Sequence, residues 1–214
     1  MTLKKIRLIL LAAGAVWAFT ISAGLGFLWN YEGTPGAAAA APERWPADSR
    51  IRRAADRATL VMLAHPRCPC TRASIGELAR VMTQAQGRVT AYVLFVKPAD
   101  SAVGWEQTDL LSSAAAIPGV QVLRDDDGVE AARFHAATSG QTLLYDAEGR
   151  LLFSGGITSA RGHQGDNAGR AAIVALLTTA AAKQEGTPVF GCPIFAPGPD
   201  CRGRKEAGGA EDSH

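Results

Sequence analysis

The stretch ATLVMLAHPRCPCTRASIGELARVM, residues 58–82, joins a strand pattern, two cysteines and a helix pattern in direct succession. Residues 58–64 form a short apolar run that is typical of a buried strand. After the cysteines, four residues recur at the i, i+3, i+4, i+7 spacing of a helix with one buried face: Ile75, Leu78, Ala79 and Met82. The cysteines are therefore predicted to lie in the loop between a buried strand and an amphipathic helix.

The motif Cys68-Pro69-Cys70 sits where this helix should begin. Proline suits the first helical position and pushes the preceding residue out of the α region, so Cys68 is predicted to be the N-cap and Cys70 to lie in the first turn. A helix N-terminus favours negative charge and lowers the pKa of a cysteine. Arg67 and Arg72 would add to this effect if they point inward, and Cys68 is expected to lie nearer to solvent than Cys70.

The chain has four cysteines, Cys68, Cys70, Cys192 and Cys201, and they allow three full pairings among which the sequence does not choose. A Cys68–Cys70 disulfide requires Cα atoms within about 7 Å, and with Cys68 outside the helix it is feasible but strained. Strained, exposed disulfides are the more oxidising ones. Cys192 lies in TPVFGCPIF, an apolar patch predicted to dock on the domain. There it serves as a resolving cysteine, as a third thiolate ligand, or in a structural disulfide with Cys201.

On either side of the motif the sequence alternates strand and helix patterns. After the first strand and helix come a strand, a weak helix, a strand, a short helix, two strands around the turn AEG, and a final helix near residues 173–180. Strands joined by helices must be parallel, whereas the last two form an antiparallel hairpin. The predicted class is α/β, with a mixed sheet covered by helices on both faces and the cysteines at the carboxyl end of a central strand.

The N-terminus carries a membrane signal. Lys4, Lys5 and Arg7 precede an apolar run from residue 8 to 29, and about 20 such residues span a bilayer. A signal peptide has a shorter apolar core followed at once by its cleavage site, so an uncleaved single-pass anchor is the better interpretation. The positive flank stays in the cytoplasm, and the rest of the chain faces the periplasm or the exterior. Disulfides persist there.

Four regions are expected along the chain: a membrane anchor at 1–31, an Ala/Pro-rich linker at 32–50, a domain at 51–185, and a Pro/Gly-rich tail at 186–214 that carries two cysteines. A formal net charge of +2 gives no electrostatic reason to expect nucleic acid as a partner. Asp125, Asp126 and Asp127 lack the spacing of a Ca²⁺ loop and are interpreted as a helix cap and turn. Asp166 or Asn167 is expected to cap the final helix.

The stretch VLRDDDGVEAARFHAATSGQTLLYDAEGRLLFSGGI, residues 122–157, together with the cysteine position, resembles a thioredoxin-fold domain of the membrane-anchored TlpA/ResA type. The resemblance covers roughly residues 52 to 183. The combination of HPRCPC, SGQT, GGITSARGHQGDN and FGCP is similar to a thioredoxin-like group labelled RedB. Both resemblances imply a thioredoxin-like fold.

Two departures from the family pattern concern the reaction. The family motif is C-x-x-C, whereas here Arg67 takes the place of its first cysteine and Cys70 the place of its second. The family's cis-proline would precede Thr142, but that position holds Gln141, which instead offers an amide to a substrate or to a bound water. The usual exchange mechanism therefore cannot simply be transferred.

The first functional hypothesis is a membrane-tethered, extracytoplasmic thiol–disulfide oxidoreductase without a cofactor, with Cys68 as nucleophile and Cys70 resolving, or the reverse. Its partners would be protein thiols or disulfides outside the cytoplasm. His65, Arg67, Pro69, Gln141 and His163 are the expected site-lining residues, while His135 is expected to pack or to lie partly exposed.

Three alternatives accompany it. The runner-up is a Cu(I) carrier similar to Sco-type proteins, which would bind copper through Cys68, Cys70 and His65, since thiolates select Cu(I). A thiol peroxidase ranks below it, and the last alternative is a noncatalytic thioredoxin-fold module.

Overall fold

The structure is a computed structural model that describes residues 2–37, 39–179 and 186–195. It divides into two compact units, Met1–Thr34 and Pro35–His214. The first unit is the single helix α1 (Leu3–Gly33), whose 31 residues include a window of mean hydropathy 2.1. This helix is long and apolar enough to cross a bilayer, as a single-pass anchor requires.

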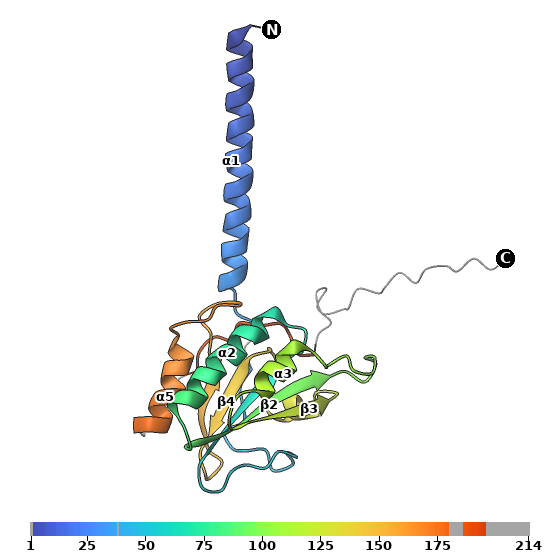
Figure 1. Ribbon diagram of the computed structural model, residues 1–214, viewed down its shortest axis with the longest axis vertical. Helices are drawn as coiled ribbons and strands as arrows, with labels where there is room; N and C mark the ends of the chain where they lie inside the picture. Colours follow the sequence, from blue (N-terminus) through green and yellow to red (C-terminus); the bar gives the residue numbers. More distant parts are fainter. Residues whose placement is uncertain (1, 38, 180–185, 196–214) are drawn as a thin grey trace, which may run out of the picture. The chain divides into compact units, whose positions relative to one another are not determined.

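The second unit is built on a five-stranded mixed sheet in the order β3-β2-β1-β4-β5 (Figure 1). β2 pairs in parallel with both β1 and β3, and β4 runs antiparallel to β5, as predicted. β4 also runs antiparallel to β1, which the sequence did not predict. The strands are β1 (Ala58–Ala64), β2 (Val89–Lys97), β3 (Val120–Asp126), β4 (Gln141–Tyr145) and β5 (Leu151–Gly155). β1 is central and every one of its residues from Thr59 to Ala64 is buried.

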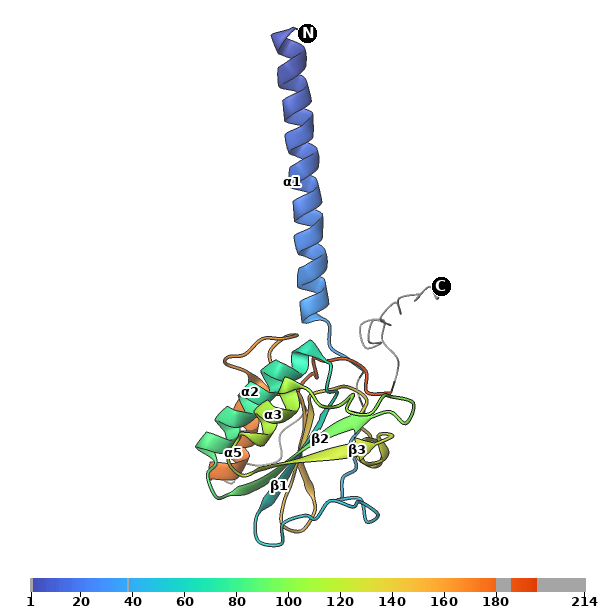
Figure 2. The same cartoon turned by 45° about the vertical axis from the view of Figure 1, so that its right-hand side comes forward.

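Three helices cover one face of the sheet: α2 (Pro69–Gln84), α3 (Asp109–Ala115) and α5 (Ala168–Thr179). α2 lies between α5 and α3 (Figures 1 and 2). Its buried residues include Ile75, Leu78 and Met82 of the predicted apolar face. The opposite face is covered by the short helix α4 (Val129–Arg133) and by chain that precedes β1.

The linker expected at residues 32–50 lies against the domain over much of its length. Trp45 packs edge-on against the rings of Phe134 and Tyr145, at centroid distances of 5.1 and 5.2 Å. The Tyr145 hydroxyl donates to the carbonyl of Pro42, and the Leu151 N–H donates to the carbonyl of Glu43. The Ala/Pro-rich composition did not indicate this packing, because one aromatic residue and backbone hydrogen bonds provide it.

Polar residues fix the helix starts near the site. The Asp125 carboxylate accepts the N–H groups of Glu130 and Ala131 at 2.9 and 2.8 Å, so its predicted role as a cap is confirmed. Asn167 Oδ1 accepts the N–H of Arg170 at 2.7 Å and caps α5.

Glu77 on α2 is fully buried and binds the loop that precedes α5. Its carboxylate accepts bonds from Arg170 Nη1 at 2.7 Å, Asn167 Nδ2 at 3.2 Å and the Gly165 N–H at 2.8 Å. These bonds hold the loop against the helix that carries the cysteines.

Candidate functional site

The two motif cysteines occupy the predicted positions at the start of α2. Cys68 is the N-cap, with extended φ −90° and ψ 118°, and Pro69 is the first helical residue. Cys68 is 0% exposed and Cys70 is 8% exposed, so the expectation that Cys68 lies nearer to solvent is wrong. The Cys68 sulfur also makes no capping bond to its own helix.

The reason for the burial of Cys68 is a chain segment that covers it, residues 186–195, which we call the covering segment. It runs beside the loop before β4: the Ser139 N–H donates to the Cys192 carbonyl at 2.8 Å, and the Ile194 N–H donates to the Ala137 carbonyl at 2.9 Å. Ile194 is buried in the core on the α4 face of the sheet. The predicted docking of the apolar patch is therefore confirmed, whereas Cys201 lies outside the described residues.

Three cysteine side chains meet at the sulfur of Cys68. The Cys192 N–H donates to Cys68 Sγ at 3.4 Å, and the thiols of Cys192 and Cys70 lie within hydrogen-bonding reach of the same sulfur. Neither Cys68 nor Cys70 is part of a disulfide in the structure. The Cys68 sulfur is thus the shared acceptor of a small hydrogen-bonded cluster.

This cluster separates the protonation states of the two motif cysteines. Hydrogen bonds from Cys192 and then from Cys70 hold the pKa of the Cys68 thiol far below its usual value, although burial opposes them. The pKa of Cys70 is raised, first because its thiol donates to Cys68 and then because of burial, while Arg161 partly offsets the increase. The cluster therefore favours one thiolate, at Cys68, beside a protonated Cys70.

The cation of the site is Arg161, in the loop between β5 and α5. It acts on the Cys70 side chain both by charge and by hydrogen bonding, and its Nη1 donates to the Gly191 carbonyl at 2.7 Å. Arg67 and Arg72, the arginines singled out in the sequence, are engaged elsewhere: Arg67 lies over the Trp105 ring and Arg72 pairs with Asp109 at the surface. Sequence reasoning missed Arg161, whose only signal is that it is the one cation in GGITSARGHQGDN.

His65 lies at the base of the cysteine loop and is 5% exposed. Its Nδ1 accepts the Arg67 N–H at 3.2 Å, and its ring meets the edge of Trp105 at a centroid distance of 5.3 Å. Burial lowers the pKa of His65, while the charge of Cys68 acts in the opposite direction. The imidazole is therefore neutral at pH 7 and serves to shape the loop.

A pair of hydroxyl groups joins the two loops of the site. Ser139 Oγ accepts the His65 N–H at 2.9 Å and lies 2.8 Å from Thr71 Oγ1. The cysteine loop and the loop before β4 are thus held at a fixed separation, and neither hydroxyl was singled out in the sequence.

Gln141 and His163, two of the expected site-lining residues, differ in their burial. Gln141 is 2% exposed and its Oε1 accepts the Ala137 N–H at 3.3 Å, so its amide oxygen closes the loop before β4 instead of facing a substrate. His163 is exposed, with Nδ1 3.2 Å from the Arg161 carbonyl. No cis peptide bond occurs in the described part of the chain. Pro69 is exposed between the two buried cysteines.

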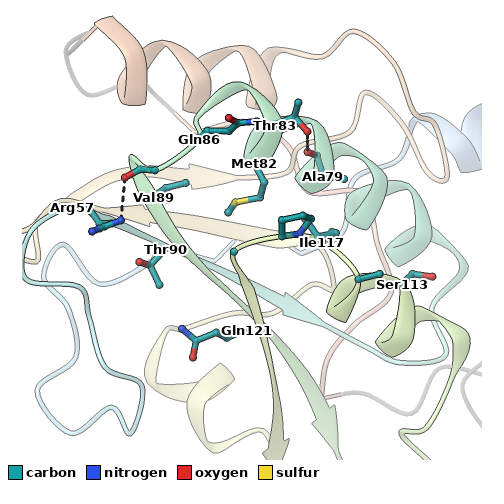
Figure 3. Close-up of a pocket in the computed structure, with 14 residues that line it drawn as sticks. Arg57, Ala79, Met82, Thr83, Gln86, Val89, Thr90, Ser113, Ile117 and Gln121 are labelled. Carbon is teal, nitrogen blue, oxygen red and sulfur yellow. Dashed lines mark hydrogen bonds between the residues drawn. The ribbon is translucent and has the colours of Figure 1, made fainter.

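A surface pocket of about 670 Å³ lies at the other end of the sheet, where β2 begins and α2 ends (Figure 3). Met82 and Thr90 are among its lining residues. Arg57, its charged residue, is bound to Asp56 at 2.7 Å and to the Gly87 carbonyl at 3.2 Å. The cysteine cluster at the carboxyl end of β1 is therefore the better candidate site.

Comparisons with solved structures agree with this architecture. The chain has a thioredoxin-like fold. A hypothetical protein from Sinorhizobium meliloti 1021 is 24% identical, with a TM-score of 0.59 over 76% of this chain and 97% of that one. An uncharacterized conserved protein from Geobacillus kaustophilus is 20% identical, with a TM-score of 0.55 over 78% of this chain and 92% of that one.

DsbF from MTB, solved in its mixed oxidized and reduced forms, is 15% identical, with a TM-score of 0.41 over 57% of this chain and 81% of that one. No protein-family model matches the chain, and no curated protein shows a significant match. The first two similarities concern the fold alone and do not identify a reaction.

Proposed function

We propose that the protein is a membrane-tethered thiol–disulfide oxidoreductase of the TlpA/ResA or RedB kind that acts on protein thiols or disulfides outside the cytoplasm. The observation that carries the proposal is the buried sulfur of Cys68 at the start of α2, which accepts the Cys192 N–H at 3.4 Å and lies beside the thiols of Cys70 and Cys192. In thiol–disulfide exchange one thiolate attacks a disulfide and another thiolate departs. Hydrogen bonds that stabilise a thiolate raise its population at neutral pH and make it a better leaving group.

The two cysteines of the Cys-Pro-Cys motif have different roles in the proposed reaction. Cys68 is the sulfur that changes its bonding, because it is the one held as a thiolate. Cys70 remains a thiol and stabilises that charge as a hydrogen-bond donor. Arg161, beside Cys70, keeps the surroundings of the cluster positive.

The test is redox titration of the full chain in detergent. The protein is equilibrated with mixtures of reduced and oxidised glutathione, the thiols are trapped in acid, and the alkylated species are counted. We expect a reversible two-electron couple with a potential above about −300 mV, which is the upper range of structural disulfides. Cys68→Ser should abolish the couple, and Cys201→Ser is the matched control. Cysteines that change state only on unfolding would contradict the proposal and identify a noncatalytic module.

The copper alternative receives less support from the site. Within the described ranges, no group of three or more His, Cys, Asp or Glu side chains is placed to hold a metal ion. Nδ1 of His65, its proposed nitrogen ligand, already accepts the Arg67 N–H. Titration of the reduced chain with Cu(I) against a competing chelator provides the check. Stoichiometric binding that is lost in Cys68→Ser would replace the exchange proposal by a carrier.

A further inference from the structure

We propose that Cys192, and not Cys70, is the redox partner of Cys68, and that Cys192 is the sulfur through which the site exchanges with its substrate. The proposal rests on the exchange function proposed above and identifies both the couple and the point of entry. Three observations carry it: the way the covering segment is fixed, the geometry of the competing pair, and the exposure of the three cysteine residues.

The covering segment is built into the domain on both sides of Cys192. Thr187 Oγ1 donates to the Gly156 carbonyl at 2.6 Å, and Arg161 Nη1 holds the carbonyl of Gly191. Gly191 lies so close to the Ser139 carbonyl that a side chain at this position would collide with it. On the other side, Ile194 is buried in the core. The contact between Cys192 and Cys68 is thus fixed by packing over the whole segment.

The competing pair, Cys68 and Cys70, is two positions apart at the start of a helix. Cys68 lies outside the helix, as its N-cap, and the Cys70 thiol reaches its sulfur, so a bond between them is feasible but strained, because it must close across only two positions at the first turn of α2. Cys192 approaches the same sulfur from a separate segment, with its own N–H directed at Cys68 Sγ. It can close a disulfide without unwinding the helix.

Exposure decides where a substrate can react. Cys68 is 0% exposed and Cys70 is 8% exposed, whereas Cys192 is only partly buried. A sulfur atom of another protein must approach along the line of the bond that it breaks, which needs open space at the attacked atom. Of the three described cysteines, Cys192 is the least buried as a residue, and we infer that a protein substrate reaches its sulfur first.

The Cys68–Cys192 disulfide then oxidises a substrate dithiol in two exchange steps. A substrate thiolate attacks Cys192 Sγ of the oxidised protein; the Cys68–Cys192 bond breaks, a substrate–Cys192 bond forms, and Cys68 departs as a thiolate. A second substrate thiol loses its proton and attacks the substrate sulfur of the mixed disulfide, which releases Cys192 to take up a proton. The substrate dithiol loses two electrons and two protons, and the protein gains the two electrons. A second disulfide compound reoxidises the pair by the same exchange in reverse.

The chemistry of the leaving group gives the reaction its direction. Exchange is faster when the departing thiol has the lower pKa, and the hydrogen bonds to Cys68 stabilise it as the departing thiolate. Stabilisation of the reduced form makes a couple more oxidising. The inferred substrate class is therefore a reduced protein dithiol, which the site oxidises.

Disulfide mapping of the full chain tests the pairing. Trypsin cleavage after Arg67, Arg72, Lys183 and Arg202 places Cys68 and Cys70 in the peptide 68–72, and Cys192 and Cys201 in the peptide 184–202. The chain is oxidised with glutathione disulfide, alkylated and digested. We expect the two peptides to be joined in wild type and in the Cys70→Ser/Cys201→Ser variant. A disulfide within peptide 68–72 would overturn the proposal.

Trapping with glutathione disulfide tests the point of entry. In reduced Cys68→Ser we expect a lasting mixed disulfide on Cys192, whereas Cys192→Ser should lose rapid exchange and keep Cys68 shielded from alkylation. Cys201→Ser serves as the matched control and should exchange as wild type does, whereas Cys70→Ser should keep the Cys68–Cys192 couple at a shifted potential. If Cys192→Ser exchanges as fast as wild type while Cys68→Ser does not, the exchange function stands and the role of Cys192 falls. If no form exchanges, the function itself fails.

Discussion

At the scale of one residue, the environment of Cys68 is set both by its neighbours in sequence and by residues far along the chain. Its place as N-cap follows from Pro69, a local rule that the sequence displays. Its contact with the Cys192 N–H, which helps to bury it, comes instead from a residue 124 positions away. Sequence reasoning therefore located the sulfur correctly but assigned it the wrong exposure. Arg161 was missed for the same reason, because nothing local connects it with Cys70.

The depressed pKa of Cys68 predicts how the reduced protein responds to pH. An unfolded cysteine has a pKa of about 8.5, and a folded-state pKa below this value adds stability that is fully present above pH ~8.5. This contribution is lost as the pH falls through the folded pKa. We expect the ultraviolet absorbance of the thiolate in reduced full chain to persist well below pH 8 and to disappear in Cys68→Ser.

Cys70→Ser is the informative companion in that titration, because a serine hydroxyl still donates to the thiolate. A thiolate signal that titrates as an ordinary cysteine in wild type, or that survives in Cys68→Ser, would contradict the hydrogen-bonded arrangement.

At the scale of elements, α2 and α5 are joined by a buried ion pair that also sets the loop of Arg161. Glu77 is 0% exposed and binds Arg170 Nη1 at 2.7 Å. Removing one partner of a buried pair leaves an uncompensated charge, and Glu77→Ala is expected to lower the free energy of unfolding by about 3–5 kcal/mol. Denaturant unfolding of the reduced chain measures the change.

Arg80 supplies the control for that substitution. It lies 3.7 Å from the same carboxylate but is about half exposed, so Arg80→Ala should change the free energy of unfolding by less than about 1 kcal/mol. Equal losses in the two variants would show that the Glu77–Arg170 contact does not hold the elements together.

Hydropathy predicted that the covering segment docks on the domain, but it did not predict the path of the segment. The apolar letters of TPVFGCPIF predicted docking, but the path of the segment depends on Gly191. Gly191→Ala should displace the segment and expose Cys68 and should raise its alkylation rate in the native reduced chain, whereas Pro188→Ala, an exposed change nearby, should not. Unchanged alkylation in Gly191→Ala would mean that the segment does not shield the thiolate.

At the scale of the whole molecule, the sequence predicted the sheet and its helices well because strand and helix periodicities, turn residues and caps are local signals. The hairpin of β4 and β5 and the caps at Asp125 and Asn167 are confirmed. The chain from residue 39 to 50 and the covering segment were harder, since both pack without forming a helix or a strand of the sheet. Their docking depends on surfaces that exist only once the sheet has formed.

The placement of the domain relative to a membrane is a prediction of the charge pattern around α1. In a background with all four cysteines replaced by serine, Val103→Cys, a fully exposed position, should react in intact spheroplasts with a membrane-impermeant maleimide. Thr2→Cys should react only after lysis. The opposite labelling, or release of the unlabelled chain into the aqueous fraction, would contradict an outward-facing anchored domain.

The contact between residues 68 and 192 also has a topological consequence. A covalent link there would enclose 124 positions of chain, which include β2 to β5 and all the helices from α2 to α5. Closing a ring of this size restricts the unfolded chain by an amount worth about 4–5 kcal/mol. The oxidised protein would therefore be more stable to unfolding than the reduced protein, and each turnover would switch the domain between these two stabilities.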